Sequence, residues 1–89
     1  MFLKVYKLVY TSEARSQIHG LGHKIQSQIK KALERLAQDP SQGKRLTGDL
    51  DPLWSYRSGD YRIIYQVFHK DVLVVIVAVG NRKDVYKRL

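Results

Sequence analysis

The pattern of hydrophobic and polar positions predicts a strand at the start of the chain. The segment Phe2–Tyr10 is rich in β-branched and aromatic residues, a composition typical of strands. An alternation of period two places Leu3, Val5 and Val9 on one side of it, with Lys7 as the exception. We therefore expect a strand over this segment.

Two helices are predicted next. Thr11 and Ser12 are suitable N-cap residues for a short helix, which Gly20 and Gly22 end. A longer helix follows over about 23–37, because five apolar residues recur there at helical spacing, and an Asp-Pro pair then stops it. The five residues are Ile25, Ile29, Ala32, Leu33 and Leu36. The glycines between the two helices predict an αα-hairpin.

The second half of the chain predicts a loop followed by three strands. Residues 40–52 are rich in turn-forming residues and predict the loop. Strand-like runs cover 53–57, 61–68 and 72–79 with short turn signals between them, so they predict an antiparallel meander. The run 72–79 is almost wholly apolar, which predicts a strand buried on both faces at the centre of the sheet.

The element order β-α-α-β-β-β defines the expected fold class. Because both helices precede most of the strands, the order indicates an α+β fold rather than an alternating α/β fold. We expect a single domain over residues 1–89, with two N-terminal helices packed on a twisted antiparallel sheet of about four strands. The helices take one face of that sheet, so the other face has to be covered by something else or be used.

The composition indicates what kind of partner the protein binds. Lys and Arg number 16 against 8 Asp and Glu, so the net charge is +8. A charge of this sign favours a polyanionic partner, because Lys and Arg bind phosphate and release counterions. The longest apolar run has eight residues, whereas a membrane span needs about 20. With no secretion signal in the sequence, we expect a cytoplasmic protein that does not bind membranes.

Several kinds of catalytic site are excluded. The chain has no cysteine, which excludes disulfide scaffolds and thiolate zinc sites. It has no Gly-rich phosphate loop, and its histidines, His19, His23 and His69, are scattered. Asp49 and Asp51 fit turn positions better than a metal pair. We therefore expect neither a metal nor any other cofactor.

The positive signal is a pair of arginines on a predicted hairpin. Whether the turn residues are Ser58-Gly59 or Gly59-Asp60, the period of two places Arg57 and Arg62 on one face, and in the second register they lie directly opposite. Like charges opposite one another destabilise a sheet, and an anion between the two guanidinium groups relieves that repulsion. The alternative is that Arg57 or Arg62 pairs with Asp60 or with an aspartate of the loop.

The end of the last predicted strand adds two candidates. Pairing of the last two strands places residue 62 near 78 and 79, so Arg82 and Tyr86 fall at the same end of the sheet as Arg62. A tyrosine beside arginines can act as a base, because cations favour its phenolate. Alternatively, Tyr86 packs the C-terminal tail onto the sheet. Three further basic residues are expected near these groups: Lys44, Arg45 and Arg57.

These motifs resemble those of the RelE/ParE toxin superfamily. The resemblance rests on LWSYRSGDYRIIYQV (53–67) and VLVVIVAVGNRKDVYKRL (72–89), and the helical segment KIQSQIKKALERLAQDP with GKRLTGDL fits the same family. It implies a RelE-like fold and the toxin of a type II toxin–antitoxin system. In the RelE branch, such a toxin is a ribosome-dependent endoribonuclease, an mRNA interferase that needs no metal because the RNA 2′-hydroxyl attacks the adjacent phosphate. The implied partners are the ribosome, mRNA and a cognate antitoxin in a hetero-oligomeric complex.

The resemblance also implies residue roles. The family's arginine on the GYR-type strand matches Arg62, its arginine after the last strand matches Arg82, and its C-terminal tyrosine matches Tyr86, so these three are the expected catalytic residues. Two family lysines fall on Leu53 and Ser55, so the base role that one of them has in some members passes to Tyr86 or to a loop residue such as Lys44. The expected RNA-binding residues are Lys44, Arg45, Arg57, Lys83 and Lys87.

Two other functions stay open on these residues. A ParE-like toxin binds DNA gyrase and cuts nothing, and a basic module binds without catalysis. The joint presence of Arg62, Arg82 and Tyr86 favours the endoribonuclease, because a pure binder needs no such convergence. The replacement of the lysines at positions 53 and 55 points the other way.

Overall fold

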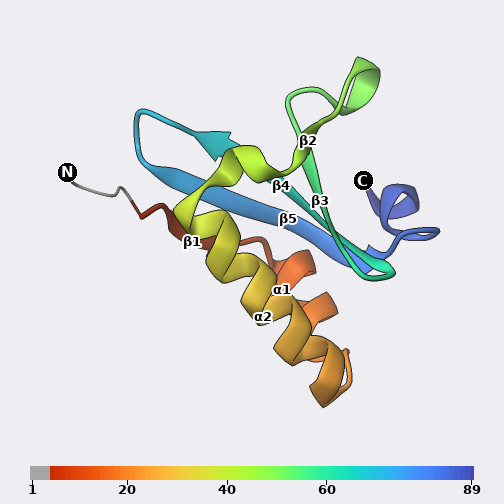
Figure 1. Cartoon of the computed structure of the whole chain (residues 1–89). Helices are drawn as coiled ribbons and strands as arrows, with labels where there is room; N and C mark the ends of the chain where they lie inside the picture. Colours follow the sequence, from red (N-terminus) through yellow and green to blue (C-terminus); the bar gives the residue numbers. More distant parts are fainter. Residues whose placement is uncertain (1–4) are drawn as a thin grey trace.

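Two helices pack on one face of a five-stranded sheet (Figure 1). The computed structural model describes residues 5–89, with Arg88 described by its backbone alone. The elements are β1(Lys7–Tyr10), α1(Ser12–His19), α2(His23–Gln38), β2(Lys44–Arg45), β3(Trp54–Ser58), β4(Tyr61–Phe68) and β5(Leu73–Asn81), with short 3-10 turns η1(Pro40–Gln42), η2(Gly48–Leu50) and η3(Val85–Arg88). The predicted α+β class, with the helix pair on a sheet, is confirmed.

The sheet is mixed and has one strand more than expected. Its strand order is β1-β5-β4-β3-β2. Strands β5, β4, β3 and β2 pair antiparallel in turn, whereas β1 runs parallel to β5. The extra strand, β2, lies in the segment predicted as a loop, and two residues are too few to show a period in the sequence.

Strand β1 is shorter than predicted and turns its other face to the core. The predicted residues 2–4 lie outside the described part of the chain. Tyr6, Leu8 and Tyr10 pack against the core, whereas Val5 and Val9 are 65% and 39% exposed. The side of the strand that was predicted to face the core therefore faces outward. The exposed Lys7 fits that outward side.

Strand β5 is an inner strand, but the middle position belongs to β4. Its burial alternates, with Val74 and Ile76 buried among the residues that face the helices and Leu73 and Val75 only half-buried. The prediction of a central strand buried on both faces is therefore wrong. The apolar run reflects a strand that is fully covered on one face and partly covered on the other.

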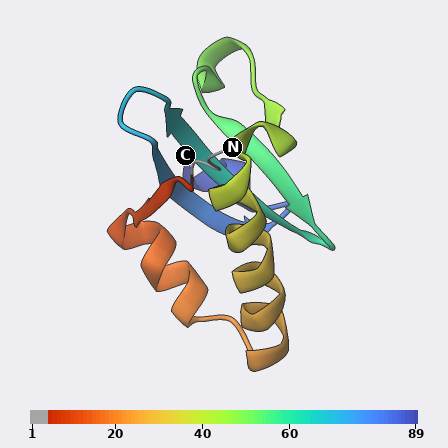
Figure 2. The same ribbon diagram turned by 60° about the vertical axis from the view of Figure 1, so that its left-hand side comes forward.

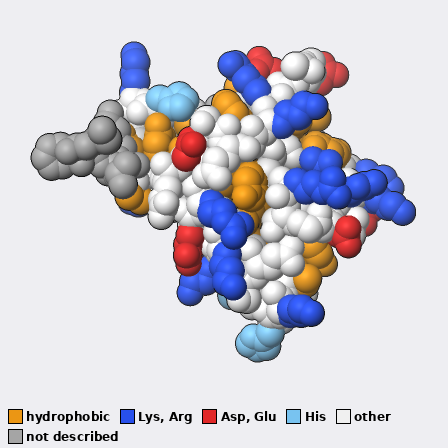
Figure 3. Space-filling view, in the orientation of Figure 1, with side chains coloured by type: hydrophobic (Ala, Val, Ile, Leu, Met, Phe, Trp, Pro, Cys, Tyr) orange, Lys and Arg blue, Asp and Glu red, His pale blue; other side chains and the backbone are white. Residues whose placement is uncertain are grey.

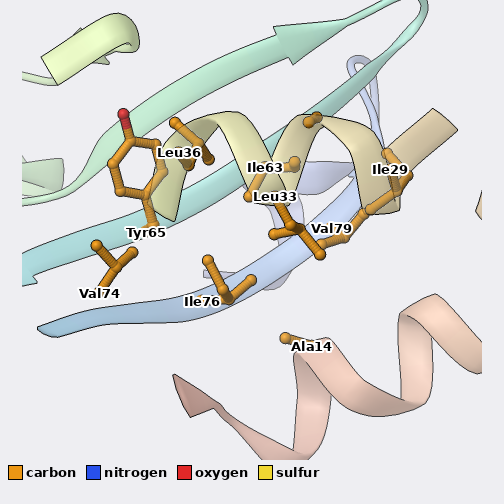
Figure 4. Close-up of a cluster of buried hydrophobic side chains, with 10 residues drawn as sticks. Ala14, Ile29, Leu33, Leu36, Ile63, Tyr65, Val74, Ile76 and Val79 are labelled. Carbon is orange, nitrogen blue, oxygen red and sulfur yellow. The ribbon is translucent and has the colours of Figure 1, made fainter. Parts of the chain in front are cut away.

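The main core lies between the helices and the sheet (Figure 4). The predicted stripe of α2 supplies Ile29, Leu33 and Leu36, which meet side chains of β4 and β5 such as Ile63 and Ile76. The predicted cap of α1 is confirmed, because the Thr11 hydroxyl accepts a hydrogen bond from the Ala14 amide at 3.0 Å. The two predicted glycines separate the helices, with Gly20 at the end of α1 and Gly22 at the start of α2.

Tyr65 ties the segment after α2 to this core. It is completely buried, and its hydroxyl donates a hydrogen bond to the Pro40 carbonyl at 2.6 Å. Gly43 lies against the same hydroxyl, where any Cβ would collide with it. Burial raises the pKa of Tyr65 to about 12.

The opposite face of the sheet carries a smaller cluster under the C-terminal segment. Val85 of η3 is buried there against Ile64 and Ala78. It also lies over Gly80, about van der Waals distance from where a Cβ would stand. Figure 2 shows η3 behind the sheet when the helices are in front. The turn η3 thus covers part of this second face of the sheet. The charged end of the same face carries the candidate site.

Candidate functional site

The β3–β4 hairpin positions two arginines side by side. Ser58 pairs with Tyr61, so the turn residues are Gly59 and Asp60, and Gly59 takes the positive φ of 60° that such a tight turn needs. Arg57 lies directly opposite Arg62, as one of the two predicted registers requires. Directly opposite side chains share a face, and here it is the face away from the helices.

Neither arginine has an acidic partner among residues 5–89. Arg57 is exposed, and its Nε donates to the Gly59 carbonyl at 3.2 Å. Arg62 is half-buried, and its Nη1 donates to the Ser55 hydroxyl at 3.4 Å. The alternative in which these arginines pair with Asp60 or a loop aspartate is therefore wrong. Two guanidinium groups that no carboxylate neutralises form a favourable place for an anion.

Ser55 joins Arg62 to the C-terminal segment. It is only 3% exposed, and its Oγ accepts a second hydrogen bond, from the Tyr86 hydroxyl at 3.2 Å. Tyr86 reaches this point because the burial of Val85 fixes η3 on the sheet. Sequence reasoning identified Ser55 only as a replaced lysine, although its place two residues before Arg57 on one strand already puts both on one face.

Arg82 lies at the same end of the sheet. Its backbone amide donates to the Asp60 carbonyl in the hairpin turn at 2.9 Å. Its side chain is exposed and, within the described residues, makes no hydrogen bond or ion pair. The partner of Arg62 on β5 is Gly80, one residue beyond the predicted 78–79, because the register shifts by a bulge between Ile64 and Tyr65.

Strand β2 sends its two cations to opposite faces. Lys44 lies opposite Ser55 and so shares the face of the site. Arg45 lies opposite Trp54, which packs towards the helices. Lys44 is exposed, whereas the Arg45 guanidinium lies 3.5 Å from an Asp51 carboxylate oxygen. Of the two predicted RNA-binding residues on this strand, only Lys44 therefore belongs to the site.

The C-terminal segment adds exposed lysines to the same side of the molecule. Lys83 and Lys87 are both exposed, and the ammonium group of Lys87 lies 3.9 Å from Asp84. Such an exposed ion pair is weak and leaves Lys87 able to bind another anion. Figure 3 shows a continuous group of Lys and Arg side chains on the right of the view, where Figure 1 places the C-terminal end of the chain.

The chemistry offered by these groups is phosphate binding together with proton transfer. Guanidinium groups bind phosphate oxygens in a bidentate way, and the Tyr86 and Ser55 hydroxyls can donate or accept a proton. No group of three or more His, Asp or Glu side chains that would hold a metal occurs among the residues that the structure describes. Over the same residues, no helix is long and apolar enough to cross a bilayer.

Comparisons with known proteins identify the family of this chain. A family model described as "ParE toxin of type II toxin-antitoxin system, parDE" matches residues 8–86. The toxin RelG of Mycobacterium tuberculosis is 33% identical over 85 residues, which cover 93% of this chain and 98% of RelG. The mRNA interferase toxin RelE of Escherichia coli is 31% identical over 80 residues, which cover 88% of this chain and 84% of RelE.

Solved structures give the same assignment. A toxin in the crystal structure of the toxin–antitoxin complex RelBE2 from Mycobacterium tuberculosis superposes with a TM-score of 0.85 at 29% identity, covering 93% of this chain and 98% of that one. The isolated E. coli RelE toxin superposes with a TM-score of 0.74 at 29% identity, covering 93% of each chain. The chain therefore belongs to the RelE/ParE superfamily and is a RelE-like toxin of a type II toxin–antitoxin system.

Proposed function

We propose that this toxin is a ribosome-dependent endoribonuclease that cleaves mRNA without a metal ion. The observation that carries the proposal is the convergence of Arg62 and Tyr86 on the Ser55 hydroxyl, next to arginines without acidic partners among the described residues. The names of the E. coli and Shigella flexneri relatives, both called mRNA interferases, support it. The proposed partners are the ribosome, its mRNA and a cognate antitoxin, and the proposed location is the cytoplasm, where mRNA is translated.

The proposed reaction needs three groups. A base takes the proton of the RNA 2′-hydroxyl, a cation balances the charge on the phosphorane, and the leaving 5′-oxygen receives a proton. The 2′-oxygen forms its bond to phosphorus as the bond to the 5′-oxygen breaks, which leaves a 2′,3′-cyclic phosphate. No oxidant, reductant or metal enters this balance.

The site supplies a candidate base and a candidate counter-charge, and the leaving 5′-oxygen takes its proton from water. Arg62 is half-buried and faces the opposite arginine, so we assign it to the charge that develops on the phosphorane. Arg82 holds the same phosphate from the end of β5. Tyr86 is the proposed base, with Lys44 as the alternative because it lies opposite Ser55 on the same face. Arg57, Lys83 and Lys87 then bind flanking phosphates.

A second candidate function follows from the name of the matching family model. The model is named for ParE toxins, so the alternative is a ParE-like toxin that binds DNA gyrase and cuts no RNA. The two candidates differ in what the arginines are for. In the second they contact a protein, and no bond in RNA is broken.

Primer-extension mapping of mRNA after brief expression of the toxin separates these functions. We expect new 5′ ends within translated regions, and we expect them to disappear when translation initiation is blocked. The matched control is Arg62→Ala, which should arrest growth weakly and produce no new ends. Arrest of growth by the wild-type toxin with intact mRNA would contradict the endoribonuclease and favour the gyrase-binding toxin.

A further inference from the structure

The hydroxyl of Ser55 is the atom on which the candidate catalytic groups meet. Ser55 is a buried polar side chain, at 3% exposure. The Arg62 Nη1 lies 3.4 Å from its Oγ, and the Tyr86 Oη lies 3.2 Å from the same atom. Arg62 comes from the centre of the sheet and Tyr86 from the C-terminal turn, so this one oxygen links two parts of the chain.

The donor and acceptor capacity of the groups fixes the direction of the hydrogen bond between Arg62 and Ser55. A guanidinium has only donors, so Ser55 has to accept the bond from Arg62. The second lone pair of Ser55 accepts the bond from the Tyr86 hydroxyl. When Tyr86 acts as the base it is the phenolate, and the Ser55 hydroxyl then donates its own proton to the phenolate oxygen while it still accepts from Arg62.

Both partners of Ser55 need such an anchor. An arginine side chain loses up to about 2 kcal/mol of rotamer freedom when it is fixed in one place, and Arg62 has no acidic partner to hold it among residues 5–89. Tyr86 lies on a four-residue 3-10 turn close to the end of the chain, where Val85 is buried and the half-buried Tyr86 ring packs in the same cluster. Packing therefore places the ring, and the hydrogen bond to Ser55 fixes its hydroxyl relative to the Arg62 guanidinium.

We propose that Ser55 is a positioning residue, which holds the Arg62 guanidinium and the Tyr86 hydroxyl at a fixed separation around one phosphodiester. This inference rests on the proposed endoribonuclease function and assigns a role within its site. Loss of one hydrogen bond of this kind costs about two- to tenfold in rate.

The test measures single-turnover cleavage of mRNA on programmed ribosomes for Ser55→Ala and Ser55→Thr. We expect Ser55→Ala to slow cleavage by about tenfold at saturating ribosomes, and Ser55→Thr to restore most of the rate because it keeps the hydroxyl. Ser58→Ala is the matched control, since Ser58 lies on the same strand but contacts Gln28 on the helix side. It should cleave at the wild-type rate.

A double-mutant cycle separates positioning from a general effect on the fold. If Ser55 acts through Tyr86, then Ser55→Ala costs less in a Tyr86→Phe background than in the wild type. If its loss only loosens the protein, the cost is the same in both backgrounds. Equal costs in both backgrounds would overturn the proposal, and so would a wild-type rate in Ser55→Ala.

A measurement without RNA tests the positioning role of Ser55 separately from the proposed endoribonuclease function. The ¹³Cζ resonance of Tyr86 reports the hydrogen bond of its oxygen, and we expect it to move in Ser55→Ala and to stay in place in Ser58→Ala. A resonance unmoved by Ser55→Ala would overturn the contact and the positioning role with it. A wild-type toxin that cleaves no RNA while the resonance moves as expected would instead overturn the proposed function.

Discussion

At the residue scale, the cost of placing like charges together marks the site. Arg57 and Arg62 face each other across one strand pair, an arrangement that destabilises a sheet unless an anion lies between the two groups. In the described part of the chain neither guanidinium group forms a salt bridge, whereas Arg45 pairs with Asp51 and Lys87 pairs with Asp84. This arrangement is the reason that we assign the pair to anion binding in the proposed function.

Neighbouring cations on β2 give a test of this view. Lys44 shares the face of Ser55, whereas Arg45 points to the other face, so Lys44→Ala should slow cleavage at least about tenfold and Arg45→Ala should leave it within about twofold. Both residues are exposed, so neither change should alter folding. Single-turnover cleavage at saturating ribosomes checks both variants. Equal losses in the two variants would show that β2 contributes only charge, whichever face the charge lies on.

Period-two reasoning predicted the shared face of the arginines but not the role of Ser55. The register of the hairpin follows from the turn residues, so Arg57 and Arg62 were predictable from the sequence. The contact between Tyr86 and Ser55 depends on how η3 folds back over the sheet, which the burial of Val85 decides. No local pattern in the last ten residues encodes that path.

At the scale of elements, the strongly periodic segments were predicted well and the edges of the sheet were not. The α2 stripe and the β3–β4 hairpin each carry many residues with one consistent period. Strand β2 has two residues and β1 has four, so pairing partners rather than their own patterns define them. Pairing also decides which face of β1 is inward, because Tyr6 and Leu8 reach the core and Val5 does not.

Tyr65 gives a stability test of the segment that carries β2. Tyr65→Phe removes the hydrogen bond to Pro40 and should lower the free energy of unfolding by about 0.5–1.5 kcal/mol at neutral pH. Urea unfolding followed by circular dichroism measures the difference. A variant as stable as the wild type would show that the apolar packing of the ring, rather than its hydroxyl, holds this segment.

The same residue predicts a dependence on alkaline pH. Burial raises the pKa of Tyr65 to about 12, whereas in the unfolded chain a tyrosine loses its proton near 10. Between pH 10 and 12 the unfolded state therefore binds fewer protons than the folded state, so stability falls as the pH rises. We expect the difference in stability between wild type and Tyr65→Phe to shrink over this range and to change sign at its upper end. A difference that stays constant from pH 9 to 12 would contradict the assignment.

At the scale of the whole molecule, the basic side of the protein sets its response to salt. Six cations lie on or beside the site: Lys44, Arg57, Arg62, Arg82, Lys83 and Lys87. If each contacts one phosphate of single-stranded RNA, the log–log slope of affinity against salt is about −4, which is a loss of about 300-fold between 50 and 200 mM salt. Titration of a short RNA at several salt concentrations measures the slope. A flat response would exclude this side as the RNA-binding surface.

The opposite side of the molecule offers a place for the antitoxin. A groove of about 590 Å³ runs between α1 and α2, with apolar residues such as Ile18 and Leu33 in its lining and Arg15 and Lys30 among its cations. We expect the antitoxin segment bound by the toxin to be acidic, as the net charge of +8 favours. A disordered acidic tail that folds on binding would suit such a groove.

Charge reversal on α2 tests this partner. Lys30→Glu should weaken binding of the antitoxin about three- to tenfold, whereas Lys31→Glu, one residue along the same helix and outside the groove, should change it far less. Calorimetry with the product of the neighbouring gene measures both affinities. Equal affinities of the two variants would place the antitoxin elsewhere on the toxin.

Single-turnover cleavage of mRNA on programmed ribosomes by Arg62→Ala tests the central claim most directly. Arg62 is assigned to the charge of the phosphorane, so its loss should slow cleavage by at least about 10²- to 10³-fold. The variant should unfold at a urea concentration no lower than that of the wild type, because the change relieves the repulsion between the facing guanidinium groups and removes only one long hydrogen bond. It should bind the antitoxin with the same affinity. Cleavage by Arg62→Ala at the wild-type rate would contradict the account.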